Sequence, residues 1–110
     1  MVEITYKVQP EKSNNVYTLD VIGHAASAPV GEDLVCAGAS TLITALATTL
    51  AEHSDWLTLR NISLKEGNSR IKIIPKKKDE YKVRLIFGTI LNGFQLLHQS
   101  FPDYIQLNEC

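Results

Sequence analysis

Residues 33–52 have the sequence DLVCAGASTLITALATTLAE, and their apolar spacing decides the fold. Apolar side chains recur at the 3.6-residue period of a helix with one buried face. Asp33 is a plausible N-cap, and Glu32 adds negative charge at the positive end of the helix. We therefore predict a helix from Asp33 to about Glu52. Its apolar stripe comprises Val35, Ala39, Leu42, Ile43, Leu46 and Leu50.

The segments on either side of this helix have the alternation of β-hairpins. Residues 2–8 alternate apolar and polar side chains, and residues 16–22 are β-branched and apolar, so both are predicted strands. Residues 57–64 and 70–74 form a second predicted hairpin around a turn at residues 65–69. The small, irregular stretch from Gly23 to Gly31 is predicted to be a loop, because it contains Pro29 and ends in glycine.

A second helix is predicted from near Asp79 to Pro102, and residues 104–107 are a short last strand. The apolar face of this helix comprises Val83, Phe87, Ile90, Phe94 and Leu97. The order ββαββαβ predicts an α+β fold, in which one mainly antiparallel sheet of about five strands packs against two helices. No linker or repeat divides residues 1–110, so we predict one domain.

The composition excludes several classes of function. The net charge is −1, from 11 basic and 12 acidic residues, which argues against broad, charge-driven nucleic-acid binding but not against one local basic patch. No apolar run approaches the roughly 20 residues of a membrane span, and the charged N-terminus does not resemble a signal peptide. We therefore expect a cytoplasmic protein that binds no membrane and makes no direct contact with nucleic acid.

The cysteines and histidines do not predict a metal site. Cys36 and Cys110 are expected to be reduced thiols in a cytosol. Two cysteines do not complete a four-ligand zinc site, and His24, His53 and His98 lack metal-ligand spacing. We expect neither a metal ion nor another cofactor.

One histidine and one cysteine have the positions that thiol catalysis needs. His24 follows a predicted strand, and Cys36 lies in the predicted first turn of the helix. Helix N-terminal N–H groups favour the thiolate, and an imidazole can take the thiol proton and later protonate a leaving amine. Ser40 is four residues further on and shares the helix face of Cys36.

Each of these residues also has a purely structural interpretation. A free cysteine beside an apolar helix is often a small core residue, and a strand-end histidine such as His24 is usually structural. Asp33 either caps the helix or orients His24, Ser40 is a packing residue, and Gly23 and Gly31 are turn glycines. The residues alone therefore leave a thiol enzyme as one of several possibilities.

A longer pattern resembles a known family. Gly23-His24-Ala25 is followed by residues 31–40, with the sequence GEDLVCAGAS, and this arrangement is similar to the ribosomal-processing cysteine protease family, called Prp. The family pattern is Gly-His-Ala/Ser, a short loop, and then Gly-x-Asp-x-Val-Cys-Ala-x-x-Ser. Chain length, element order and the stretch Asn92-Gly93-Phe94 extend the resemblance over essentially the whole chain.

The resemblance implies a function and roles for the motif residues. Cys36 would be the nucleophile and His24 the general base, with Gly23, Gly31, Asp33 and Ser40 as supporting or substrate-binding residues. The resemblance also implies a cytoplasmic homodimer, as found in bacteria of the Firmicutes type and their relatives. Enzymes of this family remove an N-terminal extension, ending in an apolar, aromatic-rich motif, from a large-subunit ribosomal protein, the twenty-seventh by the usual count.

Two other classes of function stay open at the level of sequence. The first is a non-catalytic ribosome-assembly module, in which the motif only binds a protein tail. The second is a redox thiol protein, for which Cys110 would be a weak candidate as the resolving cysteine.

Overall fold

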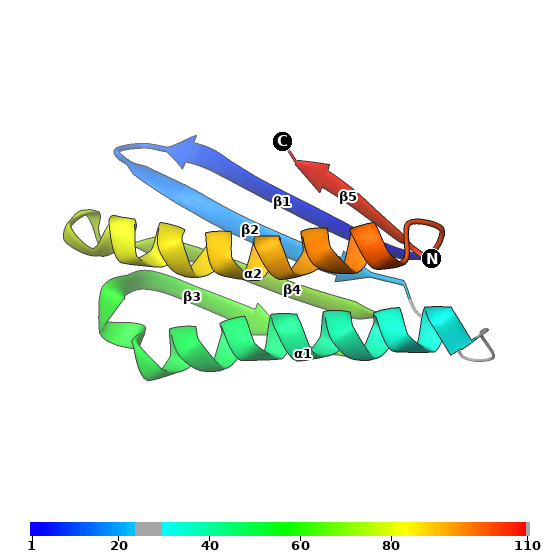
Figure 1. The fold of residues 1–110 in the computed structure, drawn as a ribbon. Helices are drawn as coiled ribbons and strands as arrows, with labels where there is room; N and C mark the ends of the chain where they lie inside the picture. Colours follow the sequence, from blue (N-terminus) through cyan, green and yellow to red (C-terminus); the bar gives the residue numbers. More distant parts are fainter. Residues whose placement is uncertain (24–29, 110) are drawn as a thin grey trace.

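A single five-stranded sheet and two long helices make up the fold. The structure is a computed structural model that describes residues 1–23 and 30–109. The strands are β1 (Val2–Glu11), β2 (Asn14–Ile22), β3 (Leu57–Ser63), β4 (Asn68–Pro75) and β5 (Ile105–Glu109). The helices are α1 (Val30–Glu52) and α2 (Glu80–Ser100). The short 3₁₀ turn η1 (Ser54–Trp56) follows α1, and the short 3₁₀ turn η2 (Lys77–Asp79) precedes α2. The predicted α+β class and the order ββαββαβ are confirmed (Figure 1).

The strand order is β3-β4-β2-β1-β5. All neighbouring strands are antiparallel except β1 and β5, which are parallel. The β1–β2 hairpin is longer than predicted, because its pairing continues to Glu11 and Asn14 and the chain reverses at Lys12, which has a φ of 58°. The sequence did not predict that β2 pairs with β4. This pairing brings the start of β4 beside the end of β2.

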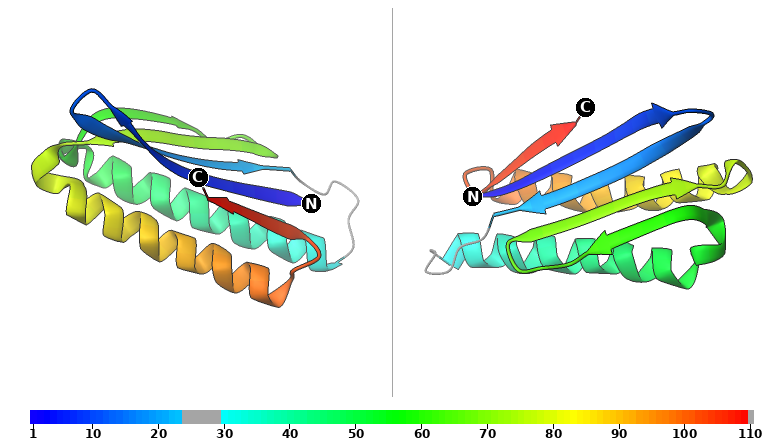
Figure 2. Two further views of the ribbon diagram at one scale, coloured as in Figure 1. Left: turned by 90° about the horizontal axis from the view of Figure 1, so that it is seen from above. Right: turned by 180° about the vertical axis from the view of Figure 1, so that it is seen from behind.

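Both helices cover the same face of the sheet, and the other face is open (Figure 2). The core lies between these two layers, as the predicted helix stripes require. Helix α1 buries its side through Val35, Ala39, Ile43, Leu46 and Leu50, and α2 through Val83, Phe87, Ile90 and Phe94. Tyr17, Leu19, Ile71 and Ile73 are buried opposite them on the sheet.

Two glycines allow α1 and α2 to lie close together. A Cβ atom at Gly38 would come within 2.9 Å of a Leu97 methyl group. A Cβ atom at Gly93 would come closer still to Leu42, at 2.5 Å, which explains the glycine in the Asn92-Gly93-Phe94 stretch. Each glycine therefore receives a leucine from the opposite helix.

Helix α1 begins earlier than the sequence predicted. It starts at Val30, so Gly31 lies inside the helix and not in a loop, and Asp33 is a first-turn residue and not the N-cap. Glycine in a helix costs only about 1 kcal/mol, and most helical stability comes from packing of an apolar face. The strong stripe from Val35 onward therefore sustains a helix that extends beyond its local capping signals.

The same helix corrects a second expectation. Residues Asp33–Glu52 are long and apolar enough, by length and composition, to cross a membrane, so the expectation that no stretch approaches that length was wrong. The reason is that Ala, Gly and Thr fill the gaps between the larger apolar residues, with no charge between the two ends. One such helix is weak evidence for a membrane span, because a core helix passes the same test, and here its stripe packs on the sheet.

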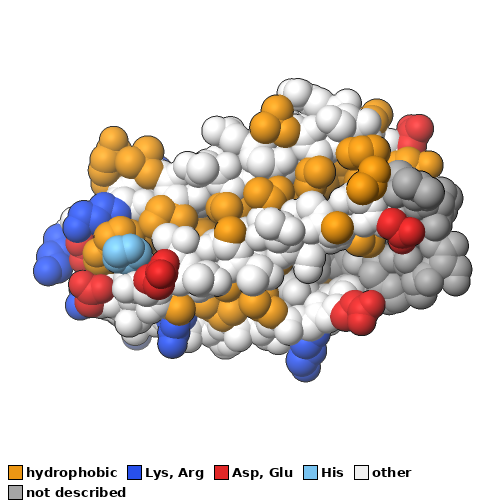
Figure 3. Space-filling model, turned by 60° about the horizontal axis from the view of Figure 1, so that its bottom comes forward, with side chains coloured by type: hydrophobic (Ala, Val, Ile, Leu, Met, Phe, Trp, Pro, Cys, Tyr) orange, Lys and Arg blue, Asp and Glu red, His pale blue; other side chains and the backbone are white. Residues whose placement is uncertain are grey.

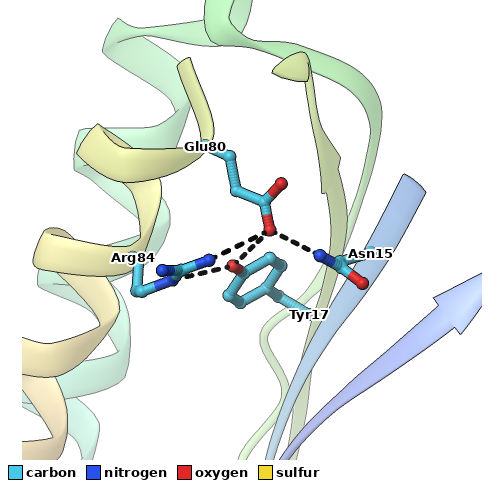
Figure 4. Close-up of polar contacts among 4 residues, drawn as sticks. All are labelled: Asn15, Tyr17, Glu80 and Arg84. Atoms are coloured by element: carbon cyan, nitrogen blue, oxygen red, sulfur yellow. Dashed lines mark hydrogen bonds and ion pairs between the residues drawn. The ribbon is translucent and has the colours of Figure 1, made fainter. Parts of the chain in front are cut away.

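A polar cluster fixes the start of α2 against β2 (Figure 4). Glu80 Oε2 accepts hydrogen bonds from Asn15 Nδ2 and from the Tyr17 hydroxyl, both at 2.8 Å. Arg84, one turn further along α2, pairs with the same carboxylate oxygen at 3.5 Å. The hydrogen bond from Asn15, followed by that from Tyr17, lowers the pKa of Glu80.

Candidate active site

The last described residue before the predicted base is Gly23, at the end of β2. Its φ is 107°, a left-handed conformation that L side chains rarely adopt. A Cβ atom there would also overlap the carbonyl oxygen of Met1. Backbone conformation and lack of space therefore both require glycine at the residue before His24.

Cys36 lies in the second turn of α1, because the helix begins six residues before it. The prediction of a first-turn cysteine was therefore wrong. The N–H of Cys36 lies beyond the four that a helix leaves unpaired, so it is committed to the helix and cannot serve as an oxyanion donor. The dipole effect also weakens after the first turn. Its side chain is half-buried and packs against the core.

Cys36 and two other predicted residues line one small pocket. This pocket, of about 60 Å³, lies where the end of β2 meets the N-terminal half of α1 and the start of β4. It joins Gly23, Cys36 and Ser40, and Ser40 is one helical turn beyond the thiol. The lining residues are Val2, Val21, Gly23, Cys36, Ala39, Ser40, Ile43, Lys65, Gly67 and Ser69.

Three residues of the opposite wall were not predicted as site residues. Lys65 and Gly67 come from the turn between β3 and β4, and Ser69 comes from the start of β4, which lies beside the end of β2. The Gly23 N–H donates to the Gly67 carbonyl at 2.9 Å, and the Ser69 hydroxyl donates to the Lys65 carbonyl at 3.1 Å. The turn therefore holds the chain as far as the residue before His24.

A signal for Ser69 was present in the sequence. On β4 the residues that point to the core alternate as Ser69, Ile71 and Ile73, and Ser69 is 9% exposed. A hydroxyl at the end of an otherwise apolar face departs from the pattern of a half-buried strand. A polar residue at a core-facing strand position can therefore indicate that the position lines a site, as Ser69 does here.

The remaining predicted residues are not brought into the pocket by the described part of the chain. Asp33 is exposed and is not among the residues that line the pocket in the described ranges. Gly31 lies in the first turn of α1. His24 and the rest of the predicted loop up to residue 29 lie outside the described residues.

The described lining of the pocket contains a possible nucleophile. Its lining includes one thiol and two hydroxyls, and Lys65 is the one charged side chain among its described residues. Across residues 1–23 and 30–109, no three His, Cys, Asp or Glu side chains lie close enough to hold a metal ion together. The described groups are those of nucleophilic catalysis.

Comparisons with known proteins agree on one family. The family model described as cysteine protease Prp matches residues 1–106. A protein named ribosomal processing cysteine protease Prp, from Staphylococcus aureus, is 28% identical over 109 residues, which cover 96% of this chain and 97% of that protein.

Solved structures share the fold over the full length. The S. aureus ribosomal processing protease Prp with a covalently linked product peptide superposes with a TM-score of 0.76 at 21% identity, covering all of both chains. SMU.848 from Streptococcus mutans gives a TM-score of 0.71 at 29% identity and covers 99% of this chain and 96% of its own. The two helices on one face of a five-stranded sheet are therefore the fold of these structures.

Proposed function

Because this chain belongs to the cysteine protease Prp family, we propose that it removes the N-terminal extension of a large-subunit ribosomal protein, the twenty-seventh by the usual count. The observation that carries this proposal is the shared pocket of Gly23, Cys36 and Ser40. Gly23 directly precedes His24, so the pocket brings the neighbour of the proposed base to the thiol. Relatives of the same length are named for ribosomal processing, which supports the substrate class.

The proposed reaction proceeds through an acyl-enzyme intermediate. His24 removes the proton from Cys36 Sγ, and the thiolate attacks the carbonyl carbon of the scissile peptide bond. The C–N bond breaks as the imidazolium gives its proton to the leaving amine. His24 then deprotonates a water molecule that attacks the thioester, which releases the new carboxyl end and restores the thiol.

The position of Cys36 in α1 limits how the oxyanion of the reaction is held. Since the Cys36 N–H is committed to the helix, the oxyanion needs other donors than that group. The hydroxyl of Ser40 lines the same pocket, and we propose that it contacts substrate there. Ser69 already donates to Lys65 and serves the wall of the pocket.

The direct test is to incubate the purified protein with the candidate ribosomal precursor and to measure the product masses. We expect two products whose masses sum to that of the precursor plus one water. Cys36→Ala and Cys36→Ser should abolish cleavage without changing the thermal unfolding temperature by more than a few degrees. Cys110→Ser is the matched control and should retain activity.

Two outcomes would contradict the proposal. Cleavage by Cys36→Ala at the wild-type rate would remove the thiol from the reaction. If the precursor stayed intact while an unrelated peptide was cleaved in a reaction that depends on Cys36, the chain would still be a protease, but the proposed substrate would be wrong. Full biological complementation by Cys36→Ala would instead favour the non-catalytic assembly module.

We further propose that the enzyme acts in the cytoplasm as a homodimer. Support for the dimer comes from apolar side chains left at the surface of the helical layer, including Leu34, Tyr81, Leu85 and Leu96. Large exposed apolar patches commonly mark partner surfaces, and a twofold dimer is the commonest assembly of small proteins.

A further inference from the structure

A second pocket lies on the open face of the sheet, away from the helices. It has a volume of about 420 Å³, within the range of small-molecule sites, and shares no lining residue with the Cys36 pocket. Tyr17 and Leu19 of β2 point into the core, so Thr18 between them points to this open face. The lining residues are Lys7, Gln9, Pro10, Glu11, Val16, Thr18, Arg70 and Lys72.

The register of three strands places two lysines on either side of one threonine. Lys7 on β1 is opposite Thr18 on β2, and Thr18 is opposite Lys72 on β4. The two lysine Cα atoms are therefore two strand spacings apart, about 10 Å. Lysine side chains are long enough for both ammonium groups to converge on one ligand group above Thr18.

Thr18 is a largely buried residue whose hydroxyl reaches the pocket. The residue is 5% exposed and lines the pocket, and no hydrogen bond joins its hydroxyl to another residue in the described ranges. Since no buried side-chain oxygen or nitrogen among the described residues lacks a partner, the Thr18 hydroxyl is open to the pocket and free to bind a ligand there. A ligand oxygen in the pocket would accept the hydrogen bond that the protein itself does not provide.

The lysines are also without partners of opposite charge. Lys7 and Lys72 are half-buried, and neither forms an ion pair with a carboxylate among residues 1–23 and 30–109. Half-buried lysines bury their aliphatic stems and keep the ammonium groups accessible, so both are available to a ligand. By contrast, Arg70 is paired. Its Nε donates to Asp20 Oδ1 at 2.6 Å and its Nη2 donates to Asp20 Oδ2 at 3.1 Å, which fixes the arginine at the edge of the pocket.

Negative charge at the pocket is confined to its ends. Glu11 is exposed near the hairpin turn, four residues along β1 from Lys7, or about 13 Å. Asp20 is neutralised by Arg70 in the row next to Thr18. The centre of the pocket therefore presents two lysine ammonium groups and the Thr18 hydroxyl.

We propose that this pocket binds a phosphate group. A phosphate offers three acceptor oxygens, which match two ammonium groups and one hydroxyl, and it carries the negative charge that the lysines lack. The phosphate belongs either to a small phosphate ester or to the backbone of RNA, and both present the same chemistry to the row Lys7, Thr18 and Lys72. The small net charge of the chain is consistent with one local site and not with a broad basic surface.

The test measures binding to the full-length protein by amide NMR shifts and by fluorescence anisotropy. The probes are inorganic phosphate, ribose 5-phosphate and a short single-stranded RNA. We expect saturable shifts at Lys7, Thr18 and Lys72, while residues around Cys36 do not move. Lys7→Gln/Lys72→Gln should weaken binding at least about tenfold, and Thr18→Val should weaken it severalfold with the fold intact.

The matched control removes the same charge elsewhere. Lys77→Gln/Lys78→Gln changes two lysines of η2 that do not line the pocket and should leave binding unchanged. Tight binding by ribose 5-phosphate assigns a small ester, and binding by RNA alone assigns a nucleic-acid backbone. Absence of saturable binding by all three probes, or equal loss in both double variants, would overturn the proposal. Since peptide cleavage is not the readout, failure here leaves the proposed protease function intact.

Discussion

Gly23 is the residue at which the fold and the proposed chemistry meet. Its left-handed φ of 107° and the Met1 carbonyl oxygen leave no place for a side chain. We expect Gly23→Ala to destabilise the protein by roughly 2 kcal/mol or more, since the strain and the overlap add. It should also reduce peptide cleavage, because the displaced backbone leads directly into His24. Thermal unfolding and product mass measure the two effects.

Gly88 provides the matched control for that substitution. It lies in α2, and a Cβ atom there meets nothing within 4 Å. Gly88→Ala should therefore stabilise the protein by about 0.5–1 kcal/mol and leave cleavage unchanged. Equal stability of Gly23→Ala and the wild type would contradict the structural account of this position.

His24 is tested best through pH. His24→Ala should lower kcat by a factor of about 10² to 10⁴, the usual loss when general acid–base help is removed. The pH–rate profile of the variant should also lose its acidic limb near the ordinary imidazole pKa. His98→Ala is a suitable comparison, because His98 lies near the C-terminal end of α2, has its Nδ1 3.1 Å from the Ile105 carbonyl and does not line the pocket. A profile that His24→Ala leaves unchanged would exclude this residue as the base.

At the level of residues, the sequence predicted the thiol side of the pocket but not its far wall. Gly23, Cys36 and Ser40 belong to the pattern that resembles the Prp family, and it was this resemblance that predicted them together. Lys65, Gly67 and Ser69 reach the pocket only because β4 pairs with β2, a long-range contact that local periodicity does not encode. The turn itself was predicted, but its neighbour was not.

Among the elements, α2 is held to the sheet by a group that titrates. The pKa of Glu80 is lowered by hydrogen bonds from Asn15 and Tyr17, so its contribution to stability is present above the pKa of the unfolded chain and is lost as pH falls through the folded value. Glu80→Gln should destabilise the protein by about 1–2 kcal/mol near pH 7. The difference should shrink as the pH is lowered below about 4.

Urea unfolding between pH 3 and 8 checks the Glu80 prediction. Glu66→Gln, in the exposed turn after β3, serves as the control and should track the wild type. If Glu80→Gln were as stable as the wild type at pH 7, or if the difference persisted undiminished at pH 3, the cluster in Figure 4 would not be the cause.

The helices also show where local signals mislead. The N-cap signal at Asp33 and the glycine at position 31 predicted a start that is too late, because capping contributes about 1 kcal/mol while the buried face of α1 contributes far more. The helix α2 shows the opposite case. Its predicted limits, from Asp79 to Pro102, enclose Glu80–Ser100, since a proline and a polar turn there coincide with the ends of the apolar stripe.

For the whole molecule, the two-layer design leaves two surfaces with different character. The open sheet face is polar and carries the pocket around Thr18. The helical side shows a broken band of hydrophobic side chains (Figure 3). Along it, an apolar groove of about 490 Å³ lies between α1 and α2. Its lining residues are Ala37, Gly38, Thr41, Leu42, Gly93, Leu96, Leu97 and Ser100.

The proposed homodimer is expected to use this helical side. Leu96 lines the groove and is 63% exposed, so a charge there should weaken an apolar interface. Sedimentation at micromolar concentration should give twice the 12.2 kDa chain mass for the wild type, and Leu96→Lys should shift it toward the single chain. Leu59→Lys is the control, since Leu59 is 39% exposed on the edge strand β3 and should leave the mass unchanged. A wild-type mass near 12.2 kDa that holds across dilution would end the dimer proposal, and the exposed leucines of the helical side would then be ordinary surface of a monomer.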